Sequence, residues 1–214
     1  MHSQPIDVRR VESARATAFS QLVEIYTEAI TPGGRKSVAR LAEMIEQPAY
    51  FFLVGEQLER AVGFAIIRAF DGSGAALLEY LAVARDCRDC GIGSALLRKI
   101  MSLDAFSSRF LLAEVDSDKK ASAERAECAR RKRFYRRLGW KEIEQLDYIM
   151  PPVSDTPPPE MDMLVYSPAL PAWIERERLR QWLECCYIEV YGQLSDDPRI
   201  HEMTSRLPEQ VQLI

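Results

Sequence analysis

The stretch RDCGIGSALL, residues 88–97, separates an apolar run from a segment with helical spacing. The apolar run before it, ALLEYLAV (residues 76–83), has the length and composition of a buried strand. Two glycines one residue apart, Gly91 and Gly93, stand where this strand would lead into the helix. Because the first amides of a helix have no partners inside the helix, the arrangement predicts a loop that binds an anionic group.

The glycine spacing distinguishes three kinds of phosphate-binding loop. A P-loop requires GxxxxGK[ST], and no Lys-Ser/Thr pair follows Gly93 at that spacing. A dinucleotide-binding loop favours GxGxxG, but Leu96 holds the third position. The pattern that remains is Arg-x-x-Gly-x-Gly, in which Arg88 can bind a phosphate oxygen. The residues expected to bind a pyrophosphate are Arg88, Asp89, Cys90, Gly91, Ile92, Gly93 and Ser94.

Hydrophobic periodicity on both sides of the loop predicts a mixed α/β fold. The expected strands are 6–11, 49–56, 61–70, 75–84, 109–116, 140–150 and 161–167. The expected helices are 19–30, 36–45, 95–103, 122–138 and 172–190. This order describes an antiparallel meander that feeds a β-α-β crossover. We expect one domain over residues 1–167 and a helical extension over residues 168–214, packed on that domain or on a second copy in a homodimer.

Composition limits the classes of protein to which the chain can belong. The net charge of −4 and the pI of about 5.4 argue against a dedicated nucleic-acid binder. No apolar run approaches the roughly 20 residues that span a bilayer, and the first residues show no signal-peptide core. The expected location is therefore cytoplasmic, without membrane contact, and the five cysteines are expected to be reduced thiols.

Cys87 and Cys90 form a CxxC pair, which is a weak signal for a metal or redox site. No second pair is present, and the two histidines, His2 and His201, lie near the ends of the chain. A tetrahedral zinc site would therefore lack ligands. We expect no metal and interpret the pair as small side chains in a tight loop.

Three stretches together resemble the GCN5-related N-acetyltransferase (GNAT) superfamily. They are RDCGIG, which matches the Arg/Gln-x-x-Gly-x-Gly/Ala signature, EYLAV (residues 79–83), and FYRRLGW (residues 134–140). The order of elements also matches over residues 6–167. The resemblance implies a mostly antiparallel, twisted central sheet flanked by helices, and the expected C-terminal helix is an extra element beyond the usual family core. It also implies that acetyl-CoA binds as co-substrate, with its pyrophosphate on the glycine loop.

The resemblance further assigns roles to individual residues. The backbone of Leu81, Ala82 and Val83 would bind the pantetheine arm and polarise the acetyl carbonyl. Tyr135 would be the general acid for the CoA thiolate. Glu114 would relay the amine proton, with Glu79 as the competing base; each could instead be a partly exposed residue near a strand end. Cys128, also counted with the cofactor-binding positions, replaces the Asn that many members carry seven residues before the tyrosine.

These features predict an N-acetyltransferase that moves an acetyl group to a primary amine of a small molecule or peptide. Direct attack by the amine is expected, because neither Cys90 nor Cys128 has a nearby histidine in the sequence to activate it as a nucleophile. The alternative is an inactive acyl-CoA-binding sensor or protein-interaction module. The identity of the amine stays open among polyamines, amino acids, aminoglycosides, peptide N-termini and lysines.

Overall fold

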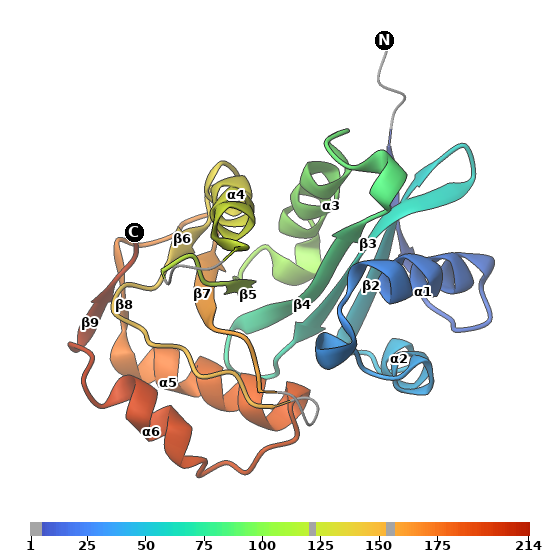
Figure 1. The fold of residues 1–214 in the computed structure, drawn as a ribbon. Coiled ribbons are helices and arrows are strands. Elements are labelled where there is room, and N and C mark those ends of the chain that lie inside the picture. The colour runs from blue at the N-terminus through green and yellow to red at the C-terminus, as the bar shows by residue number, and fades with distance from the viewer. Residues whose placement is uncertain (1–5, 120–122, 153–156) are drawn as a thin grey trace. The chain divides into compact units, whose positions relative to one another are not determined.

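The chain divides into two compact units in the computed structural model, which describes residues 6–119, 123–152 and 157–214. Unit 1 consists of residues 1–69 and 78–106, and unit 2 of residues 70–77 and 107–214. Figure 1 shows the course of the chain from blue at the N-terminus to red at the C-terminus. The division passes through one strand, β4 (Ala75–Val83), whose first three residues belong to unit 2.

Unit 1 is built on an antiparallel meander. Its strands are β1 (Asp7–Val11), β2 (Tyr50–Gln57), β3 (Arg60–Ala69) and most of β4. Its helices are α1 (Thr17–Ala29), α2 (Val38–Ile45) and α3 (Ile92–Met101), with single 3₁₀ turns at Pro32–Gly34, Arg85–Cys87 and Asp104–Phe106. Strand β2 pairs with β1 on one side and β3 on the other, and a bulge follows Gly55.

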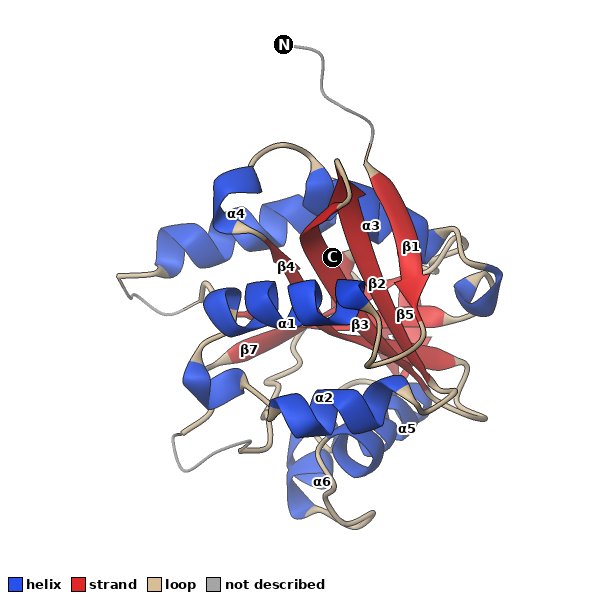
Figure 2. Cartoon of the chain, turned by 90° about the vertical axis from the view of Figure 1, so that its right-hand side faces the viewer, coloured by secondary structure: helices blue, strands red, loops and turns tan. Residues whose placement is uncertain are grey.

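The helices of unit 1 cover both faces of its strands. Phe52 and Phe64 pack with buried residues of α1, among them Phe19 and Tyr26, on the face that α2 also covers. Figure 2 shows α1 lying across these strands. Helix α3 covers the opposite face, where Gly63 lets it approach so closely that an added Cβ would lie 2.9 Å from Ile92 Cγ2.

Unit 2 contains two sheets. Its strands are β5 (Phe110–Asp116), β6 (Lys141–Glu142), β7 (Met161–Tyr166), β8 (Trp173–Glu175) and β9 (Gln210–Gln212). Its helices are α4 (Arg125–Arg136), α5 (Arg176–Cys185), the π-helical turn η4 (Cys186–Val190) and α6 (Pro198–Thr204). Strand β7 pairs antiparallel with β5 and with β6, and β8 pairs with β9 in the second sheet.

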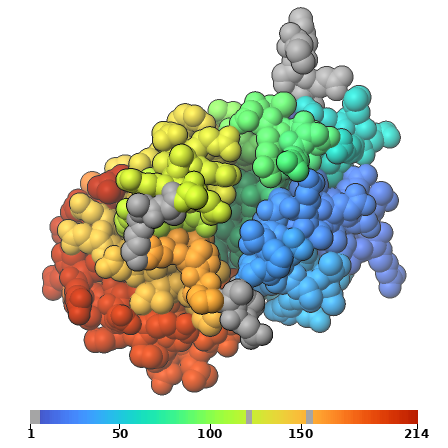
Figure 3. Space-filling model, viewed as in Figure 1, coloured from blue at the N-terminus to red at the C-terminus, as the bar shows by residue number. Residues whose placement is uncertain are grey.

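The C-terminal helices cover one face of β5 and β7. Leu112 and Val165 on that face are fully buried together with Trp182 and Leu183 of α5 and Met203 of α6. Figure 3 shows that the C-terminal residues form much of the visible surface of unit 2. Helix α4 lies on the opposite face, where its buried side chains contact β7 and β6.

The 7-stranded sheet has the strand order β1-β2-β3-β4-β5-β7-β6. A mixed α/β fold with a mostly antiparallel sheet and flanking helices, as predicted, is therefore confirmed.

Two predicted elements were wrong in part of their length. Within the expected strand 140–150, only Lys141–Glu142 belongs to the sheet, because the following backbone bonds to the C-terminal tail and Gln145 takes a left-handed φ of 62°. Trp173 lies on strand β8 and not on the expected helix, which begins at Arg176. The expected helix start at residue 122 lies outside the described residues. The domain boundary at residue 167 stays a prediction.

Candidate functional site

The glycine loop leads directly into helix α3. Gly91 is the N-cap residue, with φ 81° and ψ 0°, and no side chain caps the helix. The first helical hydrogen bond runs from Ala95 N to Gly91 O, at 3.0 Å. The amides of Ile92, Gly93 and Ser94 therefore precede the first helical bond, and the first turn carries no acidic residue. These are the properties of an anion-binding helix terminus.

The surroundings of the loop leave open space beside Gly91. Gly91 supplies the left-handed conformation that a residue with a Cβ adopts only with strain, and an added Cβ there would meet no atom within 4 Å. Ile92 and Leu96 are buried and attach α3 to the strands of unit 1. Arg88, Asp89 and Cys90 are exposed. The predicted loop residues thus form one continuous segment, which is exposed over residues 88–91, buried at Ile92 and half-buried at Gly93 and Ser94.

Glu79 lies on β4 just before Leu81, Ala82 and Val83. Its side chain is 3 % exposed and pairs through Oε2 with the ammonium of Lys36, which comes from the segment before α2. The other oxygen, Oε1, has no hydrogen-bond donor within bonding distance among the described residues. Burial, followed by the negative charge of Glu79, raises the pKa of Tyr50. Glu79 is therefore a buried carboxylate with one oxygen in an ion pair.

Tyr135 lies in the last turn of α4, in unit 2. Its ring packs edge-on against Trp140, with 5.4 Å between the ring centroids, and against Phe134, at 5.2 Å. Burial raises the pKa of Tyr135 to about 12, against a smaller opposing effect of Arg131. The phenol is therefore protonated at neutral pH and can donate a hydrogen bond.

Glu114 lies in the middle of β5 and is half-buried. Its two oxygens accept hydrogen bonds from two phenols: Tyr148 donates to Oε1 and Tyr191 donates to Oε2. Burial, followed by the negative charge of Glu114, raises the pKa of Tyr148 well above its usual value. Tyr148 therefore stays protonated and remains a donor to this carboxylate.

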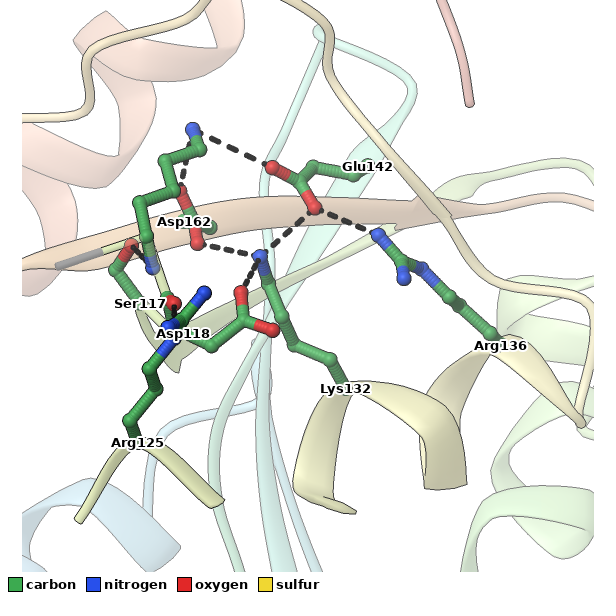
Figure 4. A network of polar contacts seen from close by, with 8 residues as sticks. Ser117, Asp118, Arg125, Lys132, Arg136, Glu142 and Asp162 are labelled. Atoms are coloured by element: carbon green, nitrogen blue, oxygen red, sulfur yellow. Dashed lines mark hydrogen bonds and ion pairs between the residues drawn. The ribbon is translucent and has the colours of Figure 1, made fainter. Parts of the chain in front are cut away.

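Buried ion pairs fix the helix that carries Tyr135. Lys132, one turn before it, is 2 % exposed and its ammonium lies 2.7 Å from Asp118, 2.9 Å from Glu142 and 2.6 Å from Asp162. Figure 4 shows these carboxylates converging on Lys132 from three segments of unit 2. The network ties α4 to β6, to β7 and to the segment after β5, and so sets the position of Tyr135 relative to the sheet.

Cys128 is buried on α4, two turns before Tyr135. Burial raises the pKa of its thiol, with a further contribution from Glu124. The thiol therefore stays protonated at neutral pH, which makes it a poor nucleophile.

Among the described residues, no group of three or more His, Cys, Asp or Glu side chains is arranged to hold a metal ion. No helix in that part of the chain has the length and hydropathy needed to cross a membrane.

The predicted site residues thus fall into two sets. Unit 1 carries Glu79, the end of β4 and the glycine loop, whereas unit 2 carries Glu114, Cys128 and Tyr135. Glu114 shares the face of Leu112, under the C-terminal helices, while Tyr135 belongs to α4 on the other face of β5 and β7.

The partners of the two glutamates were not predicted. Tyr148 is 34 residues and Tyr191 is 77 residues from Glu114, and Lys36 is 43 residues from Glu79. No periodicity or motif relates residues at such separations, because only the packing of the folded chain brings them together.

Comparison with known proteins identifies the family. The model of the acetyltransferase (GNAT) domain matches residues 48–142, a range that includes β2 to β6, the glycine loop and Tyr135. This region of the chain belongs to the GNAT superfamily. The protein is therefore an acyltransferase, and the predicted family and enzyme class are confirmed.

Solved structures share the GNAT fold. A protein assigned to the GNAT acetyltransferase family of Bacteroides thetaiotaomicron has a TM-score of 0.72 and 19% identity, over 88% of this chain and 99% of that chain. The ribosomal-protein-S18-alanine N-acetyltransferase of Escherichia coli has a TM-score of 0.56 and 18% identity, over 78% and 99%. A GNAT acetyltransferase of Elizabethkingia anophelis, solved with acetyl-CoA bound, has a TM-score of 0.51 and 13% identity, over 77% and 99%. A search of curated proteins returned no significant match.

Proposed function

We propose that this GNAT protein transfers the acetyl group of acetyl-CoA to a primary amine of a small molecule or peptide, by direct attack of the amine. One observation carries the proposal. The glycine loop presents the uncapped first amides of α3 next to the exposed Arg88, within the range that matches the acetyltransferase domain.

The chemistry of this loop fits the diphosphate of coenzyme A. The amides of Ile92, Gly93 and Ser94 would donate to phosphate oxygens, aided by the positive end of the α3 dipole. Arg88 would add a charge-assisted hydrogen bond. The backbone of Leu81, Ala82 and Val83, at the end of β4, would bind the pantetheine arm. When bound, acetyl-CoA supplies an acetyl group activated as a thioester.

Unit 2 would supply the proton transfers. In the overall reaction, the amine nitrogen bonds to the acetyl carbon, the bond from that carbon to sulfur breaks, and the amine loses a proton. We assign that proton to the carboxylate of Glu114, because both of the hydrogen-bond donors identified on it are neutral phenols. Glu79 is the competing base, but the ammonium of Lys36 already pairs with one of its oxygens. Tyr135 would donate a hydrogen bond to the departing sulfur.

The position of the carboxylate Glu114 supports an amine as the class of acceptor. A buried or half-buried carboxylate such as Glu114 can attract an ammonium and then accept its proton, which suits an acceptor that arrives protonated. The Escherichia coli relative acts on the alanine of a ribosomal protein, which is one example of such an amine in this fold.

Thiol release from acetyl-CoA across a panel of amines tests this function. The panel contains polyamines, free amino acids, an aminoglycoside and peptides with a free N-terminus or lysine. We expect turnover of at least one class, reduced about a hundredfold or more by Glu114→Gln and less by Glu79→Gln. Tight binding of acetyl-CoA without turnover of any amine would favour the alternative, a sensor. Equal activity of Glu114→Gln and the unmodified protein would remove Glu114 as the base.

A further inference from the structure

Two phenols hold the Glu114 carboxylate, one on each oxygen. Tyr148 donates to Oε1 and Tyr191 donates to Oε2, so both oxygens of the carboxylate are engaged and the side chain has one defined orientation. Hydrogen bonds donated to a carboxylate favour its ionised form. The arrangement therefore fixes the direction of the carboxylate and also stabilises the charge state that a base needs.

The two tyrosines come from two different segments of unit 2. Tyr148 lies between β6 and β7, in the segment that bonds to the C-terminal part of the chain through Ile149. Tyr191 immediately follows the π-helical turn η4 at the end of α5. Tyr191 thus brings one hydroxyl group of the C-terminal region to Glu114, in the middle of β5.

The π-helical turn determines where Tyr191 points. Tyr191 N donates to Cys186 O at 3.3 Å, a bond across five residues instead of four. An extra residue in one turn rotates the following side chain by about 100° relative to a regular α-helix. Without this turn, the phenol of Tyr191 would point away from Glu114. Single π-turns of this kind are frequent at functional sites.

Other ionisable groups also lie around this cluster. They are Cys186 and Tyr187 of η4 and Arg199 and Asp197 at the start of α6. The Arg199 guanidinium lies 5.2 Å from the centroid of the Tyr187 ring, and it is bound to the carboxylate of Asp197 at 2.6 Å. Tyr187 donates its hydroxyl to Ile149 O. Tyr187 is thus a neighbouring phenol on the same turn whose hydroxyl bonds elsewhere.

We propose that Tyr191 and Tyr148 are positioning residues that orient the Glu114 carboxylate and keep it ionised for proton transfer from the acceptor amine. The C-terminal region that carries Tyr191 then contributes a positioning residue to the active site. This inference rests on the proposed role of Glu114 as the base. The positioning itself is inferred from the two hydrogen bonds and can be measured without turnover.

Removal of single hydroxyl groups tests the inference. Tyr191→Phe and Tyr148→Phe each remove one donor to Glu114, and Tyr187→Phe is the matched control on the same turn. Carbon NMR of protein labelled at the glutamate carboxyl groups, with Glu114→Gln to assign the signal, follows the protonation of Glu114 directly. We expect its midpoint to move to higher pH by about 0.5–1 unit in Tyr191→Phe and Tyr148→Phe but not in Tyr187→Phe.

The pH dependence of kcat/KM supplies the second readout. We expect the acidic limb to shift to higher pH in Tyr191→Phe, with kcat reduced and KM for acetyl-CoA unchanged. A Glu114 midpoint that is the same in Tyr191→Phe and the unmodified protein overturns the inference, as does an equal shift in Tyr187→Phe. Full activity of Glu114→Gln would instead overturn the base assignment, and the catalytic part of this inference with it, even if the NMR midpoints shift.

Discussion

Tyr135 is assigned the role of donor to the departing sulfur, and its environment limits how it can act. Burial raises its pKa to about 12, whereas an ordinary thiol has a pKa of about 8.5. Full proton transfer from this phenol to a thiolate is therefore unfavourable. The physical role that remains is a hydrogen bond that stabilises negative charge as it develops on sulfur.

Tyr135→Phe tests this role, because it removes the hydroxyl and retains the packing against Trp140. We expect kcat to fall by about a hundredfold, as when one hydrogen-bond donor to a developing negative charge is removed, while KM for acetyl-CoA stays the same. Steady-state kinetics with saturating amine measures both. An unchanged kcat would remove Tyr135 from the mechanism.

Several buried phenols also predict how the stability depends on pH. Burial raises the pKa values of Tyr50, Tyr135, Tyr148 and Tyr187 above the usual 10. Above pH 10 the unfolded chain loses these protons before the folded chain does, so the stabilisation present below pH 10 is lost as the pH rises. We expect the free energy of unfolding, from urea titrations, to fall steadily from pH 9.5 to 11.5. A less steep fall is expected for Tyr135→Phe, and a flat profile would contradict the burial of these hydroxyl groups.

At the same scale, the sequence predicts single candidate residues but not the side chains that contact them. Gly91, Tyr135 and Glu114 stand in local motifs, and local motifs are visible in one sequence. Tyr148 and Tyr191 are recognisable only once the chain has folded, since each meets Glu114 through packing between distant segments.

Among the elements, helix α3 determines where the glycine loop lies. It packs over two glycines, Gly55 on β2 and Gly63 on β3, which are directly opposite each other in the antiparallel register. A Cβ on Gly63 would lie 2.9 Å from Ile92 and 3.0 Å from Ala82 O. A Cβ on Gly55 would lie no closer than 3.5 Å to any atom, which is an ordinary contact.

Gly63→Ala therefore tests how tightly α3 is seated, with Gly55→Ala as the matched control. We expect Gly63→Ala to cost about 1–3 kcal/mol of folding free energy, because the clash is with backbone and with a buried side chain. It also displaces Ile92, the first residue of α3, and should weaken acetyl-CoA binding. Gly55→Ala should leave both properties nearly unchanged. Chemical denaturation and calorimetry measure them, and equal effects of the two substitutions would contradict the close approach at Gly63.

Most elements were predictable because their hydrophobic periodicity is strong. The meander from β2 to β4 and the helix after the glycine loop lie within a few residues of their predicted bounds. The predictions failed where pairing with the C-terminal tail decides the structure. Trp173 pairs with Gln212 on β9, and Glu144 N donates to Gln212 O, neither of which leaves a local pattern in the sequence.

At the scale of the whole molecule, the ion pairs around Lys132 make the free energy of unfolding depend on pH. Burial alone would raise the pKa of Asp162, but hydrogen bonds from Lys119 and Lys132 lower it overall. A hydrogen bond from Lys132 likewise lowers the pKa of Asp118. Carboxyl groups with lowered pKa values stabilise the fold above their unfolded pKa of 3.8, and this contribution is lost as the pH falls below it.

Lys132→Met tests the network. It leaves three carboxylates without their shared ammonium, and we expect a loss of about 3–5 kcal/mol of folding stability at pH 7. The loss should shrink below pH 4, where the carboxyl groups become protonated. Lys119→Met is the control, because Lys119 is 50% exposed and meets only two of these carboxylates, so its effect should be clearly smaller. Thermal melts from pH 3 to 8 measure both, and a loss that does not depend on pH would contradict the electrostatic origin.

Calorimetric titration with acetyl-CoA tests the central claim, that the first amides of α3 and Arg88 bind the diphosphate. Three proteins are compared: the unmodified chain, Arg88→Ala and Gly93→Glu. A glutamate in the first turn favours the helix itself, so Gly93→Glu should fold normally while its negative charge repels the phosphates. We expect binding by the unmodified chain, about tenfold weaker binding by Arg88→Ala and no detectable binding by Gly93→Glu. Absence of heat with the unmodified chain, or equal affinity of all three proteins, would contradict the account.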